Sequence, residues 1–363
     1  MTDLLNTALT PIHFMGMTLK NRFVRSATIE GMADSDGSPG PKLKTLYRDL
    51  ASGGIGLIST GACCTDPEWI GASKGQLQLT EGTNLSAWAE TASMIHAYGA
   101  SISLQLAPFV FMGGKLTGPS PYQEGVYEIT TEEISRLAAS YAAAARLARK
   151  AGIDAVQVHG GHGYGLSQFL SPHFNRRTDA YGGSYENRVR IFTQIRRAIA
   201  AEAGDDFPVW IKMNAFDGVP GGLTPDVAAH YGKCLKAAGY GAIEVTGGVM
   251  AGTHNSRGPV DKDQWFEGFY LDGAQKVRAA VDLPVIAVGG IRTPQMVQSI
   301  LSGGIADLVS FSRPLIREPA LINRWSGGDL APAGCISCNG CFNAMVKGEG
   351  IYCVQETRSS RTR

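Results

Sequence analysis

The sequence lacks a charge excess of either sign. Its 33 Lys and Arg residues nearly balance 32 Asp and Glu residues, so the formal net charge is +1. A strongly basic chain would attract nucleic acids or anionic membranes, and this chain has no such overall field. We therefore expect no nucleic-acid partner and no membrane partner, and we expect a small-molecule substrate instead.

The sequence also lacks a long apolar run. No apolar stretch reaches about 18 residues, the length that spans a bilayer. The N-terminal residues, MTDLLNTALTPIHF, contain no basic segment followed by an apolar one, so they do not resemble a signal peptide. We therefore expect a cytoplasmic protein, in which the seven cysteines are thiols or metal ligands rather than disulfides.

Short apolar segments alternate with amphipathic helical segments along most of the chain. Such segments are typical of parallel strands that are buried on both faces. Eight of these units favour a (β/α)8 TIM barrel, an α/β fold, over a doubly wound sheet. We predict this barrel over residues 1–330 and a short cysteine-rich C-terminal extension over residues 331–363. The predicted strands are Phe23–Ala27, Ile55–Gly61, Ser101–Leu106, Ala155–His159, Val209–Met213, Ala242–Thr246, Val285–Val288 and Leu308–Phe311.

Several boundaries can be read from local patterns. Residues Thr130–Glu133 predict a capping box at the start of a long Ala-rich helix. Thr224–Pro225 and Thr293–Pro294 each place a capping hydroxyl before a proline at the first helical position. Near the N-terminus, Pro11–Phe14 and Met17–Leu19 predict a small hairpin that closes the floor of the barrel.

Three proton-carrying side chains follow the fourth predicted strand. They are His159, His162 and Tyr164, in the pattern H-x-x-H-G-Y. In α/β barrels the reactive groups lie at the carboxyl ends of the strands, so we predict that these three are catalytic. Two histidines could also be half of a metal site, but no third ligand stands at a suitable spacing. Structural histidines and a packing role for Tyr164 stay open from the residues alone.

The other strand ends carry groups that suit an anionic heterocyclic cofactor. The glycines after strand seven and Arg313 after strand eight predict a phosphate cradle, although a tight turn also explains the glycines. Lys212 lies inside an apolar strand and needs a partner, either a flavin edge or a structural ion pair with Glu244. The predicted cofactor-binding residues are Ser26, Ala27, Thr28, Gly61, Gln105, Lys212, Gly289, Gly290, Ser312 and Arg313.

Four cysteines gather near the C-terminus. Cys335, Cys338 and Cys341 are spaced C-x-x-C-x-x-C, and Cys353 follows after eleven intervening residues. Four thiolates in a short segment are what a 4Fe–4S cluster requires, and structural zinc accepts the same ligands. We predict a 4Fe–4S cluster here, with zinc and unligated thiols as the alternatives.

The segments NRFVRSAT (21–28) and HGGHGYGLSQFLSPHFNRRTDAYGGSYENR (159–188) resemble the Old Yellow Enzyme family of FMN-dependent ene-reductases, also called NADH:flavin oxidoreductases. The resemblance covers roughly the first 330 residues. It implies that Thr28, Gly61 and Gln105 contact the flavin ring. It also implies that Gly290 and Arg313 contact the FMN phosphate. The family usually has Arg where this chain has Lys212, and the loop 107–112 after Gln105 is bulkier and more apolar here.

The resemblance also implies a reaction. NAD(P)H reduces FMN, and flavin N5 then delivers hydride to an activated alkene such as an α,β-unsaturated carbonyl compound. His159 and His162 hold the substrate oxygen, and Tyr164 supplies the proton. The sequence does not choose between NADH and NADPH, nor between a monomer and a homo-oligomer.

The segment CISCNGC (335–341) is similar to the cluster-binding segment of 2,4-dienoyl-CoA reductase and trimethylamine dehydrogenase. In those relatives a further electron-transfer region follows, whereas this chain ends at Arg363. If the cluster is present, we expect a separate redox partner. The alternatives are therefore an iron–sulfur-linked dienoyl-CoA reductase-like or amine demethylase-like enzyme, and, from another class, a flavin-binding electron carrier without its own substrate.

Overall fold

The computed structural model describes residues 3–69, 74–108 and 111–361. Residues 109 and 110 of the loop after Gln105 and the outermost residues of both predicted segments therefore lie outside the described residues. No helix in the described ranges is long and apolar enough to cross a membrane. The division of the chain at residue 330 stays a prediction.

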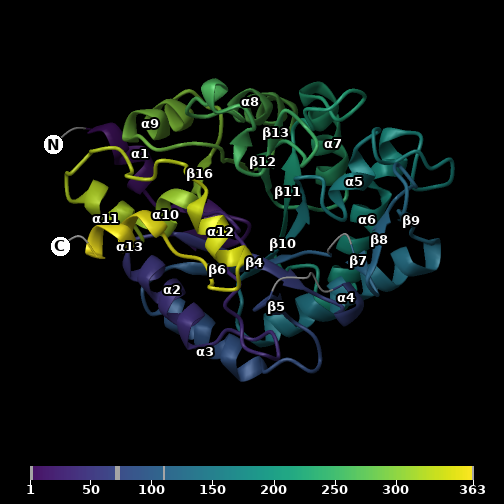
Figure 1. Ribbon diagram of the computed structural model, residues 1–363, viewed down its shortest axis with the longest axis horizontal. Helices are drawn as coiled ribbons and strands as arrows, with labels where there is room; N and C mark the ends of the chain where they lie inside the picture. Colours follow the sequence, from purple (N-terminus) through teal and green to yellow (C-terminus); the bar gives the residue numbers. More distant parts are fainter. Residues whose placement is uncertain (1–2, 70–73, 109–110, 362–363) are drawn as a thin grey trace.

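Within these ranges, eight parallel strands form a closed barrel (Figure 1), and the predicted (β/α)8 fold is confirmed. Each strand pairs with the next along the chain, and β16 pairs back with β3 to close the ring. A short strand, β5 (Leu77–Gln78), adds to the edge of β4. The barrel strands are β3 (Phe23–Arg25), β4 (Leu57–Cys64), β6 (Ser101–Leu106), β10 (Ala155–Gly160), β11 (Val209–Asn214), β12 (Ile243–Thr246), β15 (Val285–Ala287) and β16 (Leu308–Phe311).

All eight predicted strands are confirmed, with boundaries that shift by a few residues. The largest change is in β4, which runs to Cys64 instead of ending at Gly61. Its register against β6 shifts between Ser59 and Ala62, which is the signature of a β-bulge. The strand continues beyond the bulge, and the register shift changes which of its residues lie opposite those of β6.

Helices surround the barrel on the outside (Figure 1). The capping box of Thr130 and Glu133 is present at the start of α4, and Thr293 caps α9 by accepting from the Met296 amide. The prediction for Thr224 is wrong in part: α7 does begin at Pro225, but the Thr224 side chain makes no capping hydrogen bond. The principal helices are α2 (Pro41–Ser52), α3 (Leu85–His96), α4 (Thr131–Lys150), α6 (Tyr185–Ala203), α7 (Pro225–Ala237), α8 (Leu271–Ala280), α9 (Pro294–Ser302), α10 (Arg313–Arg317) and α11 (Leu321–Ser326).

Short helices and strands lie in the loops and at the ends of the chain. They are η1 (Asp3–Leu5), α1 (Asn6–Leu9), η2 (Pro67–Trp69), β7 (Phe111–Met112), β8 (Lys115–Gly118), β9 (Tyr127–Glu128), α5 (Ser167–Leu170), β13 (His254–Asn255), β14 (Gly258–Pro259), η3 (Lys262–Gln264), α12 (Gly340–Val346) and α13 (Val354–Arg361). In Figure 1, α12 lies in front of the barrel opening. The C-terminal segment is therefore close to the end of the barrel where barrel enzymes place their chemistry.

The predicted floor hairpin is confirmed. Strands β1 (Ile12–Phe14) and β2 (Met17–Leu19) pair in antiparallel fashion. Phe14 is fully buried and meets Trp210 edge to face, with ring centroids 6.0 Å apart. Phe14 and Leu19 form a separate apolar cluster with residues in or next to the barrel strands: Val24, Leu57, Ala155, Trp210, Ala242, Ile286 and Leu308. The hairpin thus fills the end of the barrel opposite the carboxyl ends of the strands.

We predict that Phe14→Ala lowers the free energy of unfolding by about 3–5 kcal/mol, because the substitution leaves a cavity beside Trp210. Urea unfolding followed by circular dichroism measures the loss. Thr18→Ala is the matched control, since Thr18 is exposed in the same hairpin, and it should change stability by no more than about 0.5 kcal/mol. Equal losses of unfolding free energy in the two variants would contradict a stabilising contact between Phe14 and the end of the barrel.

Candidate functional site

A cavity of about 380 Å³ opens at the carboxyl ends of the barrel strands. It brings together side chains that lie far apart in the sequence, from the ends of β3, β6, β10, β11, β15 and β16. Of the predicted catalytic and cofactor-binding residues, those that line it are Ser26, Ala27, Thr28, Gln105, His159, His162, Tyr164, Lys212, Gly289, Gly290, Ser312 and Arg313.

Gly61 is the exception. It is not among the residues that line the cavity, and its amide donates to Glu30 Oε1 at 2.9 Å. A Cβ at this position would collide with the Glu30 carboxylate, which is buried in an ion pair with Arg25. The bulge in β4 brings the next residue, Ala62, to the cavity wall instead. The structure therefore places Gly61 behind the site, and the pattern of the strand gave no sign of the bulge.

The two histidines occupy unlike backbone positions. His159 lies at the end of β10, and its buried Nδ1 has no hydrogen-bond partner among the residues that the structure describes. His162 has a φ of 65°, a left-handed conformation that is uncommon for a residue with a Cβ. Its amide donates to Asn214 Oδ1 at 2.8 Å, and its ring Nε2 lies 2.8 Å from Thr246 Oγ1. The strained turn is thus held by two neighbouring strands, and it brings the imidazole rings to 5.5 Å from each other.

Burial controls the protonation of all three catalytic candidates. Burial lowers the pKa of His159 to about 3, and the positive charge of Lys212 adds to the effect. Burial and the Lys212 charge also hold the pKa of His162 well below its usual value. Burial raises the pKa of Tyr164, and the Arg257 charge only partly opposes this. The site therefore holds two neutral imidazoles beside a protonated phenol, and the His159 and Tyr164 ring centroids are 6.3 Å apart.

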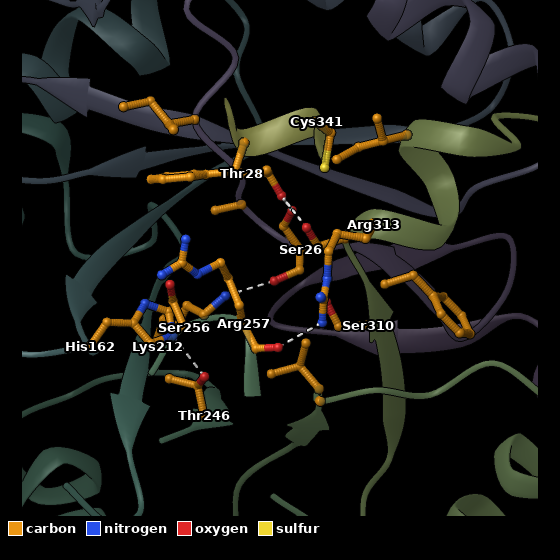
Figure 2. Close-up of a pocket in the computed structure, with 18 of the residues that line it drawn as sticks. Ser26, Thr28, His162, Lys212, Thr246, Ser256, Arg257, Ser310, Arg313 and Cys341 are labelled. Atoms are coloured by element: carbon orange, nitrogen blue, oxygen red, sulfur yellow. Dashed lines mark hydrogen bonds between the residues drawn. The ribbon is translucent and has the colours of Figure 1, made fainter. Parts of the chain in front are cut away.

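Lys212 is joined to a buried polar network beneath the cavity. Its Nζ donates to Ser26 Oγ at 2.7 Å and lies 3.4 Å from Glu244 Oε1. Glu244 is fully buried and also accepts from Ser310, at 2.9 Å. Figure 2 shows the hydrogen bond between Lys212 and Ser26 among the residues that line the pocket. The structural ion pair with Glu244 is therefore present, and Lys212 lines the cavity as well.

A second part of this network reaches Gln105. Gln157 donates to Glu244 Oε2 at 2.8 Å, and Gln105 donates to Gln157 Oε1 at 2.7 Å. The chain of hydrogen bonds fixes the orientation of the Gln105 amide at the cavity wall. Together, Gln105 and Lys212 offer a polar edge that would suit a heterocycle with both donors and acceptors.

The opposite side of the cavity is suited to an anion. Gly289 and Gly290 have φ values of 124° and 69°, and a Cβ at Gly290 would meet the Phe269 ring at 2.6 Å. The turn therefore requires glycine, and it leaves the backbone open to close approach. Arg313 follows β16, and its guanidinium donates to Asn339 Oδ1 at 2.8 Å and to the Arg257 carbonyl at 2.9 Å. Thr28 and Ser312 hydroxyls, 2.6 Å apart, complete this wall.

The four C-terminal cysteines line one small pocket next to the main cavity. Cys335 and Cys341 also line the main cavity itself. In the part of the chain that the structure describes, no three of the four sulfurs lie within 4.8 Å of one another. Tetrahedral zinc would need sulfurs about 3.8 Å apart, given its bond length of about 2.3 Å. The observed spacing is wider than that of a closed zinc site.

Sequence reasoning missed several residues of the cavity. Thr246 ends a predicted strand, so the rule that placed His159 could have found it as well. Arg257 lies in the turn between β13 and β14, where nothing in the local pattern indicates a site. The apolar roof of the cavity comes from the C-terminal segment, in which only the cysteines form a recognisable sequence pattern. Its residues in the cavity wall are Phe342, Met345, Val346 and Ile351.

Known proteins resemble this chain in sequence and in fold. The NADH oxidase of Thermoanaerobacter brockii is 31% identical over 344 residues, which cover 91% of this chain and 52% of that protein. The NADPH dehydrogenase of Bacillus licheniformis is 33% identical over 322 residues, which cover 85% of this chain and 91% of that enzyme. A solved structure of 2-naphthoyl-CoA reductase with 2-naphthoyl-CoA superposes with a TM-score of 0.86 at 26% identity, over 96% of this chain and 56% of that one.

The chain thus spans about half the length of the NADH oxidase and of the naphthoyl-CoA reductase, and nearly the full length of the Bacillus enzyme. The sequence profile of one family, described as the NADH:flavin oxidoreductase / NADH oxidase family, matches residues 8–328. That range contains every barrel strand and the whole predicted catalytic set. The resemblance read from residues 21–28 and 159–188 is therefore confirmed, and this chain belongs to the NADH:flavin oxidoreductase / NADH oxidase family. The similarity of residues 335–341 to a cluster-binding segment stays a prediction, because that segment lies outside the matched range.

Proposed function

We propose that this chain is an FMN-dependent reductase of activated alkenes that uses NAD(P)H. The observation that carries the proposal is the pair of neutral histidines beside a protonated tyrosine, inside a cavity whose other walls suit a flavin. When bound, FMN supplies hydride transfer, chemistry that no amino-acid side chain provides. The residues of the chain supply binding, orientation and the proton.

The residues present fit FMN. The backbone at Gly289 and Gly290 and the Arg313 guanidinium would hold the phosphate, because amides at a glycine turn and a planar cation both suit an anion. At the other end, Gln105 and Lys212 would hold the pyrimidine edge of the ring. Lys212 replaces the family's usual arginine with the same charge but without paired donors, so Ser26 and Glu244 determine where its ammonium points.

The substrate end of the cavity favours an alkene conjugated to an electron-withdrawing group. His159 and His162 both line the cavity, so a substrate oxygen in the cavity could approach either imidazole ring. Neutral imidazoles can donate N–H bonds to that oxygen as negative charge develops on it. Tyr164 is protonated, and its ring centroid lies 6.3 Å from that of His159. It is therefore suited to deliver the proton to the carbon next to the activating group.

Amine oxidation is less well supported than alkene reduction. Among the described residues that line the cavity there is no Asp or Glu, whereas Lys212, Arg257, Arg292 and Arg313 are present. A cationic amine would therefore enter a positively charged site without a counter-charge. The charges of the cavity favour a substrate that gains electron density on an oxygen.

We also propose that Cys335, Cys338, Cys341 and Cys353 bind a 4Fe–4S cluster. The four side chains line one pocket, and their sulfurs are spread more widely than a single zinc ion requires. Arg313 lines both this pocket and the main cavity, so the two sites are adjacent. A cluster in this place would let electrons reach the flavin from a separate redox partner as well as from NAD(P)H.

The function is tested by following flavin absorbance in two half-reactions. Under anaerobic conditions NADPH or NADH should bleach the yellow protein, and cyclohexenone should restore the colour. We predict that Tyr164→Phe slows the second step by about 10²- to 10⁴-fold, because the proton donor is lost, and leaves the first step near the wild-type rate. Equal slowing of both steps would contradict the proton-donor role. No bleaching of the wild type by either nucleotide would contradict a self-sufficient enzyme.

The protonation states predict a flat pH profile for reoxidation by cyclohexenone. Burial lowers the pKa of His159 to about 3, so this imidazole is neutral throughout the range from about pH 5 to 8, and the raised pKa of Tyr164 keeps the phenol protonated in neutral solution. The rate constant should therefore be nearly constant between about pH 5 and 8. Stopped-flow measurements check this. An inflection near pH 6.5 would mean that one histidine titrates normally and that burial does not control it.

Anaerobically purified protein should contain about four iron and four acid-labile sulfide per chain if the cluster is present. We predict that Cys338→Ser loses most of both. Cys234→Ser is the matched control, because Cys234 lies on α7, away from the C-terminal segment, and should keep its iron. Zinc in place of iron in the wild type, or iron retained in Cys338→Ser, would contradict the assignment.

A further inference from the structure

The charges that line the main cavity are unbalanced. Four cationic side chains face it, and no carboxylate is among the described residues of its wall. A cation in a partly enclosed cavity costs free energy unless an anion or a set of hydrogen bonds compensates it. The four cations are Lys212, Arg257, Arg292 and Arg313.

Three of the four cations have compensating groups. Lys212 has Glu244 and Ser26, as described above. Arg313 donates to an amide oxygen and a backbone carbonyl, and it faces the proposed phosphate site. Arg292 stacks on the Trp265 ring, with its guanidinium carbon 4.0 Å from the ring centroid, and donates to the Ser337 hydroxyl.

Arg257 is different. No carboxylate in the described ranges lies within 4.0 Å of its nitrogens, and its side chain makes a single long hydrogen bond, from Nε to Asn255 Oδ1 at 3.4 Å. Its guanidinium carbon lies 4.8 Å from the centroid of the Phe342 ring on α12. The ring covers one face of the guanidinium. Arg257 lines the main cavity and, among the described residues, has fewer compensating groups than the other three cations.

Arg257 also lies at the substrate end of the cavity. Its charge acts on Tyr164, where it lowers the pKa against the effect of burial. In Figure 2 its side chain extends to the His162 side of the pocket, while its carbonyl accepts from Arg313 on the other side. An anion held by Arg257 would therefore lie near the proton donor and the histidine pair, rather than at the proposed phosphate site.

We propose that Arg257 forms an anion subsite for the carboxylate of the substrate, and that the preferred substrates are alkenes that carry a carboxylate. This inference rests on the proposed function. The two terminal nitrogens of a guanidinium match the two oxygens of a carboxylate, which an ammonium does not do. The apolar roof of Phe342, Met345 and Val346 would cover the hydrocarbon part of such a substrate. The carboxylate itself is unchanged: hydride that originates from NAD(P)H and a proton add across the double bond.

Two matched substrates test the subsite in the holoenzyme. In 3-hepten-2-one a methyl group replaces the charged oxygen of 2-hexenoate, so the two differ mainly in charge. For Arg257→Gln we expect the ratio of kcat/KM for the acid to that for the ketone to fall about 10- to 100-fold, the range for a lost charge-assisted pair. Arg257→Lys should restore part of the ratio. Arg292→Gln, which removes a compensated cation from the same cavity, should leave the ratio near the wild-type value.

A binding measurement separates this inference from the proposed function. Hexanoate should bind the oxidised holoenzyme more tightly than hexanamide by calorimetry, and Arg257→Gln should remove the difference. If the wild type reduces neither alkene but still shows this preference, the proposed function fails and the subsite stands. An unchanged ratio in Arg257→Gln, or no preference for hexanoate, would overturn the subsite. So would a rise in KM for NAD(P)H with the substrate ratio unchanged, because the anion would then be a dinucleotide phosphate.

Discussion

The buried carboxylate of Glu244 is the interaction on which the site depends. It lies on β12, is fully buried, and accepts from groups on or next to four other strands: Ser26, Gln157, Lys212 and Ser310. A buried charge with several hydrogen bonds and one counter-ion costs far less than an isolated one, and it fixes the positions of all its partners. The network therefore ties the strand ends together and orients Lys212 and, through Gln157, Gln105 at the cavity.

The Lys212 charge has a second consequence, since it reaches the histidines. Together with burial, it keeps His159 and His162 neutral. Neutral imidazoles can hold a substrate oxygen without adding charge to a cavity that already contains several cations. The same burial keeps Tyr164 protonated. Burial and the Lys212 charge thus give the three side chains the protonation states that suit alkene reduction.

The C-terminal segment joins the barrel chemistry to the cysteine pocket. Cys335 and Cys341 contribute to both cavities, and Phe342 packs against Arg257. The segment that would hold a metal cluster therefore also forms the roof over the substrate. Because α12 carries both Cys341 and Phe342, a cluster bound at the cysteines would also position part of the cavity wall.

The sequence by itself determined the eight strands, the floor hairpin and most of the cavity residues, because buried strands, capping patterns and strand-end positions depend on local patterns of residues. It did not predict the bulge that places Ala62 rather than Gly61 at the cavity, since a register shift depends on the neighbouring strand. Nor did it reveal Arg257 or the apolar roof. Only the tertiary structure decided which distant charges meet. Arg257 has no carboxylate partner among the described residues, and this depends on the cavity walls, which come from segments far apart in the sequence.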